Sequence, residues 1–327
     1  MAAVGDESNR IGPFNPDVTA DLTGVGTEAT ATAGAAVAPP RPRSLPSASP
    51  SIGPYHLLRK IGEGGMGQVW LAQQNSPLQR QVALKLVRFG GGDRATIQRF
   101  ESERQTLARM EHPAIAKVFD AGTTPQGEPY FVMEYVPGLP ITTYCDQKRM
   151  TLKDRLALFV SVCEGVQHAH QKAIIHRDLK PSNILVTEVD GKPLPRIIDF
   201  GIAKATTSSS DAGPAFTQAG VFVGTPGYMS PEQADPNTQD VDTRTDVYSL
   251  GVVLYELLAG NTPFDSASWR GRPLHEVLRQ LQEDDPPTPS TRLEEDKTSL
   301  TSIAEKRGAP SRHLTKALAR RSGLDRA

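Results

Sequence analysis

The stretch HRDLKPSN, residues 176–183, decides how the rest of the chain is interpreted. It places a carboxylate (Asp178), two cations (Arg177 and Lys180) and a carboxamide (Asn183) within one short segment. Asp178 could accept a proton from a hydroxyl group, and Lys180 could offset the charge of a transferring phosphoryl group. Asn183 could bring an oxygen to a divalent cation. The combination therefore indicates a loop suited to phosphoryl transfer.

A glycine-rich segment, IGEGGMGQVW at 61–70, lies well upstream of this loop. Its glycines at 62, 64 and 67 follow the spacing G-x-G-x-x-G, which alone is weak evidence and also occurs in dinucleotide-binding folds. A dinucleotide site would continue into a helix, whereas residues 69–72 alternate and then reach the turn-like Asn75-Ser76-Pro77. The pattern therefore predicts a β-hairpin. Because positions 62 and 64 carry no side chains, its backbone N–H groups could approach phosphate oxygens.

An apolar strand with a single lysine, VALKLV at 82–87, follows the hairpin. A lysine exposed at a strand edge is the simpler interpretation, but its valine, alanine and leucine neighbours make full exposure of Lys85 unfavourable. Residues 94–110 have the spacing of an amphipathic helix and carry two acidic candidates for a partner, Glu103 and Glu101. We expect Glu103 to be the partner because it lies one helical turn before an apolar position, whereas Glu101 would face elsewhere.

A third polar motif, RIIDFG at 196–201, follows the HRDLKPSN loop after a hairpin with the turn Asp190-Gly191. It adds a second carboxylate, Asp199, that could bind a cation. Residues 202–223 are rich in Ser, Thr and Gly and poorly periodic, and GTPGYMSPEQ at 224–233 closes them. A polar loop of this length inside a compact domain is usually functional.

Taken together, these motifs resemble those of protein kinases. Residues 176–183 match the kinase pattern H-R-D-L-x-x-x-N at every fixed position, and Lys180 is typical of the serine/threonine branch. The segments QHAHQKAIIHRDLKPSNILV and IDFGIAKA are typical of bacterial, eukaryotic-like serine/threonine kinases. The resemblance implies an α+β fold with two lobes, a small, mostly antiparallel β lobe at 54–136 and a large, mostly helical lobe at 137–327.

The resemblance also implies the roles of the polar residues. Asp178 would accept the hydroxyl proton, Lys180 would offset charge, and Lys85 would grip the phosphates with Glu103 holding it in place. Asn183 and Asp199 would bind Mg²⁺, with Mn²⁺ as an alternative ion. The ATP site would be formed by the glycine loop, the lysine strand, the segment between the lobes and the floor beneath adenine: Ile61, Gly62, Glu63, Gly64, Gly65, Met66, Gly67, Gln68, Val69, Ala83, Lys85, Met133, Glu134, Val136 and Leu185.

In this resemblance, residues 202–223 are an activation segment. Arg177, next to Asp178, would then be a cation that awaits a phosphate, and phosphorylation of the segment would order it through charge-assisted bonds. We expect Thr217 to be the phosphorylated residue, ahead of Ser208–Ser210. Thr225 resembles the threonine that bonds the catalytic aspartate and favours serine or threonine substrates.

Composition limits the other classes of function. The net charge of −1 gives no overall attraction to nucleic acid, and no apolar run reaches the length of a membrane span, so we expect neither partner. With only two cysteines, the chain fits a reducing, cytoplasmic setting. Residues 1–53 are rich in Ala, Gly, Pro, Ser and Thr, which predicts a disordered leader. Its Pro-Pro-Arg-Pro at 39–42 could bind a partner domain, although a flexible leader is the simpler interpretation.

The C-terminal part departs from the family pattern. Relatives continue with two more helices, the last of which carries an arginine that pairs with the glutamate equivalent to Glu232. We align 323–325 with the residues just before the first of those helices, so we expect the large lobe to lack them and Glu232 to lack its partner. A second alignment places that helix at 316–318 and the arginine at Arg326.

The sequence thus predicts a serine/threonine kinase that transfers the γ-phosphoryl group of ATP to protein hydroxyls and phosphorylates its own activation segment. Two alternatives remain open at this point. One is a catalytically weak pseudokinase that binds ATP as a scaffold. The other is a small-molecule phosphotransferase of the same fold, although such enzymes usually lack a peptide-docking segment like that at 224–233.

Overall fold

The computed structural model describes residues 50–64, 67–87, 110–200, 226–235, 241–269, 271–295 and 297–321. The predicted leader lies almost wholly outside these ranges, as do the predicted helix at 94–110 and the loop at 202–223. In the described part of the chain, no helix is both long enough and apolar enough to cross a bilayer.

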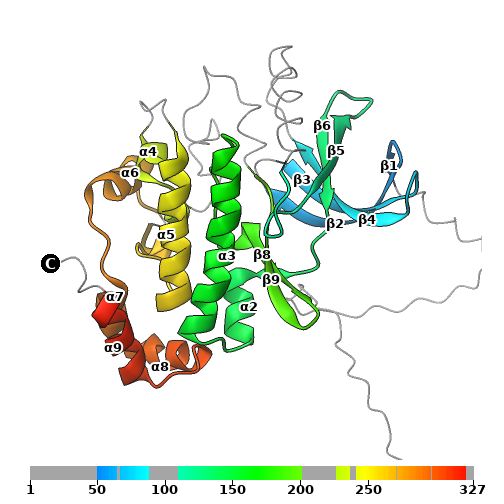
Figure 1. The fold of residues 1–327 in the computed structure, drawn as a ribbon. Helices are drawn as coiled ribbons and strands as arrows, with labels where there is room; N and C mark the ends of the chain where they lie inside the picture. The colour runs from blue at the N-terminus through cyan, green and yellow to red at the C-terminus, as the bar shows by residue number, and fades with distance from the viewer. Residues whose placement is uncertain are drawn as a thin grey trace, which may run out of the picture. The chain divides into compact units, whose positions relative to one another are not determined.

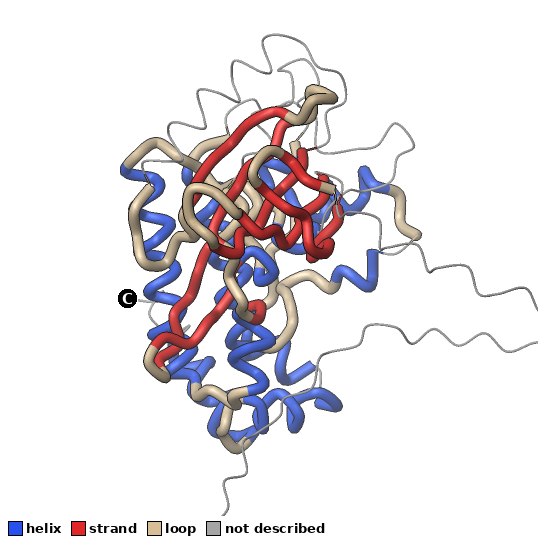
Figure 2. The backbone as a smooth tube through the Cα atoms, turned by 90° about the vertical axis from the view of Figure 1, so that its right-hand side faces the viewer, coloured by secondary structure: helices blue, strands red, loops and turns tan. Residues whose placement is uncertain are grey.

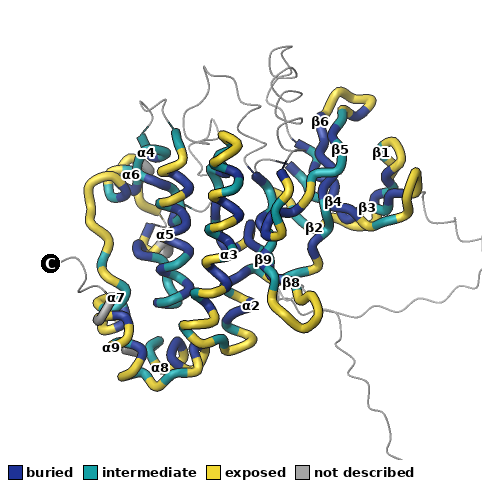
Figure 3. Tube along the Cα trace, viewed as in Figure 1, coloured by how far each residue is buried: buried dark blue, intermediate teal, exposed yellow. Residues whose placement is uncertain are grey.

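A curled antiparallel sheet forms the N-terminal part of the fold (Figure 1). Its six strands lie in the order β1-β2-β3-β4-β6-β5. The strands are β1 Ser51–Ile52, β2 Tyr55–Gly64, β3 Gly67–Gln74, β4 Arg80–Val87, β5 Val118–Thr123 and β6 Pro129–Glu134. Valine and aromatic residues in β4 and β6 favour strand pairing, and most of both strands is buried (Figure 3). The glycine-rich segment forms the predicted hairpin, with Gly64 opposite Gly67.

The apolar residues of 114–121 predict a strand, and this prediction is only partly right. In the structure β5 begins at Val118, and the preceding residues lie instead along the strand before Asp199, where Ile115 and Ile197 form a parallel bridge. The Ala116 N–H donates to the Ile197 carbonyl at 2.9 Å, and the Ile197 N–H donates to the Ala114 carbonyl at 2.7 Å. Because these backbone groups are already paired, residues 114–117 are not available to the N-terminal sheet.

The rest of the described chain is mostly helical (Figures 1 and 2). The helices are α2 Ile141–Gln147, α3 Leu152–Gln171, α4 Pro231–Ala234, α5 Thr243–Ala259, α6 Leu274–Glu283, α7 Pro289–Glu295, α8 Lys297–Lys306 and α9 Ser311–Arg321. A small antiparallel sheet in the order β7-β8-β9 lies among them, with β7 Leu139–Pro140, β8 Ile184–Val189 and β9 Lys192–Ile197. Its exposed β8–β9 turn is the predicted Asp190-Gly191, and both residues have positive φ.

Helices α3 and α5 pack against each other and form the centre of this part. Thr151 caps α3 by accepting the Asp154 N–H, and Asp242 caps α5 by accepting the Arg244 N–H. Helix α5 ends at Gly260, whose φ of 84° is a left-handed conformation that favours glycine. The main core joins their apolar sides to the inner face of β4 and β6, so one continuous apolar cluster runs from the sheet into the helices.

Three short helices, α7, α8 and α9, follow α6, and the sequence predicted neither α7 nor α8. They cover the C-terminal turns of α5: Tyr255 and Ala259 are buried against Leu293, Leu314 and Ile303. The leucine and isoleucine side chains among them each contribute about 1.5–3 kcal/mol when fully buried. The packing therefore makes 289–321 an integral part of the helical region.

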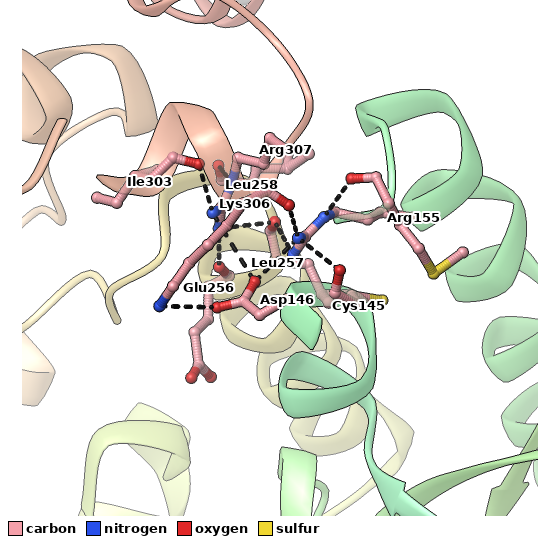
Figure 4. A network of polar contacts seen from close by, with 10 residues as sticks. Cys145, Asp146, Arg155, Glu256, Leu257, Leu258, Ile303, Lys306 and Arg307 are labelled. Atoms are coloured by element: carbon pink, nitrogen blue, oxygen red, sulfur yellow. Dashed lines mark hydrogen bonds and ion pairs between the residues drawn. The ribbon is translucent and has the colours of Figure 1, made fainter. Parts of the chain in front are cut away.

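The C-terminal ends of α2, α5 and α8 meet around two buried arginines, Arg155 and Arg307 (Figure 4). Arg307 donates to the carbonyls of Glu256, Leu257 and Leu258 at 2.6–3.2 Å, and the last two are acceptors that the end of a helix leaves unpaired. Arg155 donates to carbonyls from all three helices: Leu257 at 3.3 Å, Cys145 at 3.0 Å and Lys306 at 2.7 Å. The guanidinium groups also oppose the partial negative charge of three helix ends.

Charge around this arginine cluster is unevenly distributed. Asp146 is the carboxylate that faces it, at 2.9 Å from Arg155 and 3.3 Å from Lys306. Burial, together with the positive charge of Arg155, lowers the pKa of Arg307 to about 10. Arg307 therefore stays charged at neutral pH, and backbone carbonyls supply much of the compensation.

Replacement of Arg307 with methionine should therefore destabilise the fold strongly. The apolar stem is kept, but the Leu258 carbonyl loses the donor that Arg307 supplies in a buried setting. The Glu256 and Leu257 carbonyls each keep one other donor, from Gly260 and Arg155. We expect the free energy of unfolding, measured by urea denaturation, to fall by about 3 kcal/mol or more. Arg312→Met, at an exposed position of α9, should change it by less than about 0.5 kcal/mol. A loss at Arg307 no larger than at Arg312 would contradict this account.

Candidate functional site

The HRDLKPSN loop is anchored by Asp246, a fully buried carboxylate in the first turn of α5. Its oxygens accept the backbone N–H groups of His176 and Arg177, each at 2.8 Å, and His170 Nε2 lies 2.7 Å away. Arg177 has a φ of 65°, which is unfavourable for a side chain of its size. The bonds to Asp246 hold the backbone in this conformation.

His176 connects the loop to the segment that carries Asp199. Its Nδ1 accepts the Asp178 N–H at 3.3 Å, so its Nε2 carries the hydrogen and donates to the Ile198 carbonyl at 2.9 Å. The ring packs on Phe200, with ring centroids 4.7 Å apart. Complete burial lowers the pKa of His176, which favours this neutral form.

Asp178, Lys180 and Asn183, which the sequence grouped together, lie in direct contact. Lys180 Nζ is 2.8 Å from Asp178 Oδ2, and Asn183 Nδ2 donates to the same oxygen at 3.1 Å. Asn183 Nδ2 also donates to the Asp178 carbonyl at 2.8 Å. The nitrogen of the carboxamide is thereby committed to Asp178, and its oxygen is the atom that could bind a cation.

Lys85 and Asp199 form an ion pair between β4 and the residues after β9. The distance from Nζ to Oδ1 is 3.0 Å, and the lysine side chain is only 8% exposed. Asp199 has a φ of 59°, another unfavourable conformation in the site. The sequence analysis assigned Lys85 a different partner, Glu103, which lies outside the described residues. The pair with Asp199 was missed because a linear motif does not show which segments approach each other.

Two hydrogen bonds of the Ile198 backbone bring Asp199 close to the HRDLKPSN loop. The Ile198 N–H donates to the Asn183 carbonyl at 2.9 Å, and the Ile198 carbonyl accepts from His176. The residue before Asp199 is therefore bonded on both sides to the HRDLKPSN loop. Asp199 and Asn183, the two predicted cation ligands, are in this way brought together by the backbone.

The glycines of the β2–β3 hairpin differ in whether the packing of the fold excludes a side chain at their position. Gly67 has a φ of 138°, and a Cβ there would meet the Leu86 carbonyl oxygen at 1.9 Å, so packing against β4 demands glycine. At Gly64 a Cβ would meet nothing within 4 Å, and at Gly62 it would make ordinary contacts with Val69 at 3.7 Å. The packing of the described residues thus leaves room for a side chain at 62 and 64.

The predicted adenine-site residues lie on neighbouring strands. Ala83 on β4 is directly opposite Met133 on β6, and both are buried. Val69 is opposite Lys85, and Val136 is buried just beyond the end of β6. The Glu134 N–H already donates to the Lys117 carbonyl at 2.8 Å, so a base would meet the carbonyl of Glu134.

The remaining predicted residues fall into two groups. Ile61 is partly exposed on β2, Glu63 bonds Gln68 at 3.2 Å in the hairpin, and Leu185 lies on β8 opposite Arg196. The predicted site residues that lie outside the described residues are Gly65, Met66, Glu103, Thr217 and Thr225.

A second polar group, which the sequence analysis missed, joins residues 226–234 to α5. Tyr228 donates to Glu256 at 2.5 Å, and burial raises the pKa of both side chains. Glu232, which we expected to lack its arginine, accepts from Thr245 at 2.7 Å. No signal in the sequence identified these partners, because α5 reads as an apolar helix. The bonds of Tyr228 and Glu232 to α5 fix the position of residues 226–234. In the same segment, the Gln233 side chain donates to the Arg177 carbonyl at 2.8 Å.

Comparison with known proteins gives consistent matches. A protein-family model described as the protein kinase domain matches residues 55–314. The serine/threonine-protein kinase pkn3 of Myxococcus xanthus is 40% identical over 236 residues, which cover 71% of this chain and 42% of pkn3. PknB of Mycobacterium tuberculosis is 40% identical over 245 residues, covering 73% of this chain and 37% of PknB. The chain thus spans well under half the length of these curated relatives.

Solved structures agree with the sequence comparison. The crystal structure of the kinase domain of Mycobacterium tuberculosis PknI covers 84% of this chain and 98% of its own, with a TM-score of 0.55 and 25% sequence identity. The similarity thus extends over nearly all of that domain.

The two kinds of glycine in the hairpin can be separated by alanine substitution. Gly67→Ala should lower the free energy of unfolding by about 2 kcal/mol or more, because both its φ and its contact with β4 exclude a side chain. Gly64→Ala should leave it within about 0.5 kcal/mol of the wild-type value. Thermal or urea unfolding of the two variants provides the measurement, and equal effects at both positions would contradict the distinction.

Proposed function

Because the chain belongs to the protein kinase domain family, we propose that it is a serine/threonine protein kinase that transfers the γ-phosphoryl group of ATP to protein hydroxyls. Members of this family use ATP and a divalent metal ion and act on protein substrates. The observation that carries the proposal is the convergence of Asp178, Lys180 and Asn183 with the ion pair of Lys85 and Asp199. A scaffold that only binds ATP would not need Asp178 and Lys180 in contact.

The two carboxylate oxygens of Asp178 have different roles in this proposal. Its Oδ2 accepts from both Lys180 and Asn183, which fixes the carboxylate. Its Oδ1 would accept the proton of the substrate hydroxyl as the oxygen attacks phosphorus. Lys180, held 2.8 Å from the carboxylate, would offset charge on the transferring group. Positioning and electrostatics therefore supply most of what the chain contributes to the reaction.

The oxygens near Lys85 fit a magnesium ion. The side-chain oxygen of Asn183 and the carboxylate of Asp199 are hard oxygen ligands, which Mg²⁺ prefers and Mn²⁺ also accepts. When bound, such an ion would offset the negative charge of the phosphates. Lys85 would hold the phosphates, and Gly62 and Gly64 would leave space for them. Ala83, Met133, Val136 and Leu185 would enclose the adenine.

The domain limits proposed from the sequence, 54–136 and 137–327, are retained here as a proposal. The division falls after β6, just before β7 and the helical part. A cytoplasmic setting also remains a proposal, and it is supported by two cysteines that are both free. Acceptor residues on the chain itself are part of the proposal, since its activation segment is rich in serine and threonine.

Loss of the proposed catalytic groups should abolish phosphoryl transfer. With ATP radiolabelled at the γ-phosphate, Asp178→Asn and Lys85→Met should each reduce label on a serine-containing protein about a hundredfold or more. Asp190→Asn and Lys153→Met remove the same charges at exposed positions and should retain wild-type activity. Binding of Mg·ATP without any transfer by the wild-type chain would favour the scaffold, and label on small molecules alone would favour a metabolite kinase.

Phosphorylation of the activation segment is the second part of the proposal. Arg177 supports it, because its buried Nε has no hydrogen-bond partner among the described residues. We propose that phosphate on Thr217, ahead of Ser208–Ser210, would bind this guanidinium.

Mass spectrometry tests this second part directly. After incubation of the wild-type chain with Mg·ATP, we expect phosphate between residues 205 and 225, and none in Asp178→Asn. Arg177→Met should keep the site available but weaken the activation that phosphorylation produces. Active wild-type protein without phosphate in that segment would exclude the idea.

A further inference from the structure

Arg196 on β9 makes a set of contacts that the proposed mechanism does not use. Its Nη1 donates to the Pro113 carbonyl at 2.7 Å and to the Ile115 carbonyl at 3.3 Å. Its Nη2 lies 2.9 Å from Glu134 Oε1 at the end of β6. The other oxygen of Glu134 accepts the Lys117 N–H at 3.2 Å. One guanidinium and one carboxylate thus tie β9 to two other segments.

These contacts are largely sheltered from water. The side chains of Arg196 and Glu134 are 18% and 25% exposed. Arg196 Nε is buried and has no hydrogen-bond partner among the described residues. Leaving a buried donor unpaired costs free energy, so a plain stabilising role accounts for Arg196 only in part. The planar guanidinium reaches acceptors on two sides at once, which an ammonium group does not do.

Each of the joined segments carries part of the proposed nucleotide site. Residue 134 lies where the base would meet the backbone, and β9 leads within three residues to Asp199. Residues 113–117 follow the predicted helix of Glu103 and are bonded to β9 through Ala114, Ala116 and Ile197. Arg196 is therefore the side chain that links the adenine end of the site to the strand of the cation ligand.

We propose that Arg196 is a positioning residue for nucleotide binding, acting through its pair with Glu134. This inference rests on the proposed kinase function and adds a residue to its site. Arg196 touches neither the phosphates nor the reacting oxygen; it sets the spacing between the end of β6 and Asp199. A nucleotide must contact both at once, and small misplacements of binding groups weaken such a bidentate fit strongly. Its loss should therefore affect nucleotide affinity more than the chemical step.

The test uses the full chain with Arg196→Met, Arg196→Lys, Glu134→Met and the double methionine variant. Methionine keeps the apolar stem at each position. Calorimetric titration with Mg·ADP gives the dissociation constant, and steady-state assays on a protein substrate give KM for ATP and kcat. All are measured well below the unfolding midpoint of each variant, which is recorded separately.

We expect Arg196→Met and Glu134→Met each to raise the Mg·ADP dissociation constant and KM for ATP about tenfold, with kcat changed by less than about twofold. The double variant should be no weaker than either single one, because the two side chains act as a pair. Arg196→Lys should recover part of the affinity, since an ammonium can pair with Glu134 but does not reach Pro113 as well. Arg279→Met, which removes an exposed arginine of α6, should match the wild type in every constant.

The outcomes separate this inference from the proposed function. Variants that unfold at lower temperature but keep wild-type Mg·ADP affinity and KM would show that Arg196 is only structural and would overturn the inference. Additive effects of the two methionine substitutions would overturn the pairing with Glu134. A wild-type chain that binds no Mg·ADP would overturn the proposed function, and the inference with it.

Discussion

The carboxylate of Asp246 determines the conformation on which the site depends. It is completely buried, yet it accepts two backbone N–H groups and contacts the imidazole of His170. The partial positive charge of the first turn of α5 also favours it. Those bonds compensate the cost of burying a charge and the cost of the positive φ at Arg177, each of which is of order a few kcal/mol. Without them, Asp178 would lose its fixed relation to Lys180 and Asn183.

Helix α5 is held at both ends by charge. Asp246 lies at its N-terminal end, and Arg155 and Arg307 meet its C-terminal carbonyls. Each charge has the sign that opposes the helix dipole at that end. The helix is therefore fixed both along its axis and against its neighbours, and Tyr228, through its bond to Glu256, attaches residues 226–234 to the same support. The HRDLKPSN loop and residues 226–234 are therefore both attached to helix α5.

Motif spacing located local structure better than long-range contacts. The glycine hairpin and the turn at Asp190-Gly191 could be located because local patterns determine turns. Three features could not be predicted from such local patterns. The ion pair of Lys85 with Asp199, the bonds of residues 114–117 to β9 and the arginine cluster join segments far apart in sequence. In the last two, much of the bonding is to backbone carbonyls, which carry no residue-specific signal.

Bonding to backbone carbonyls has an evolutionary consequence at the arginine cluster formed by Arg155 and Arg307. A carbonyl oxygen is present whatever the side chain, so Cys145, Leu257 and Lys306 can be exchanged for other residues without removing the acceptors that Arg155 uses. Selection would then act on the arginine and its ion-pair partner Asp146, and leave those three residues free to drift. Methods that search alignments for correlated pairs would not detect the bonds to these carbonyls, although three helix ends converge there. Only a three-dimensional description of the acceptors exposes the dependence.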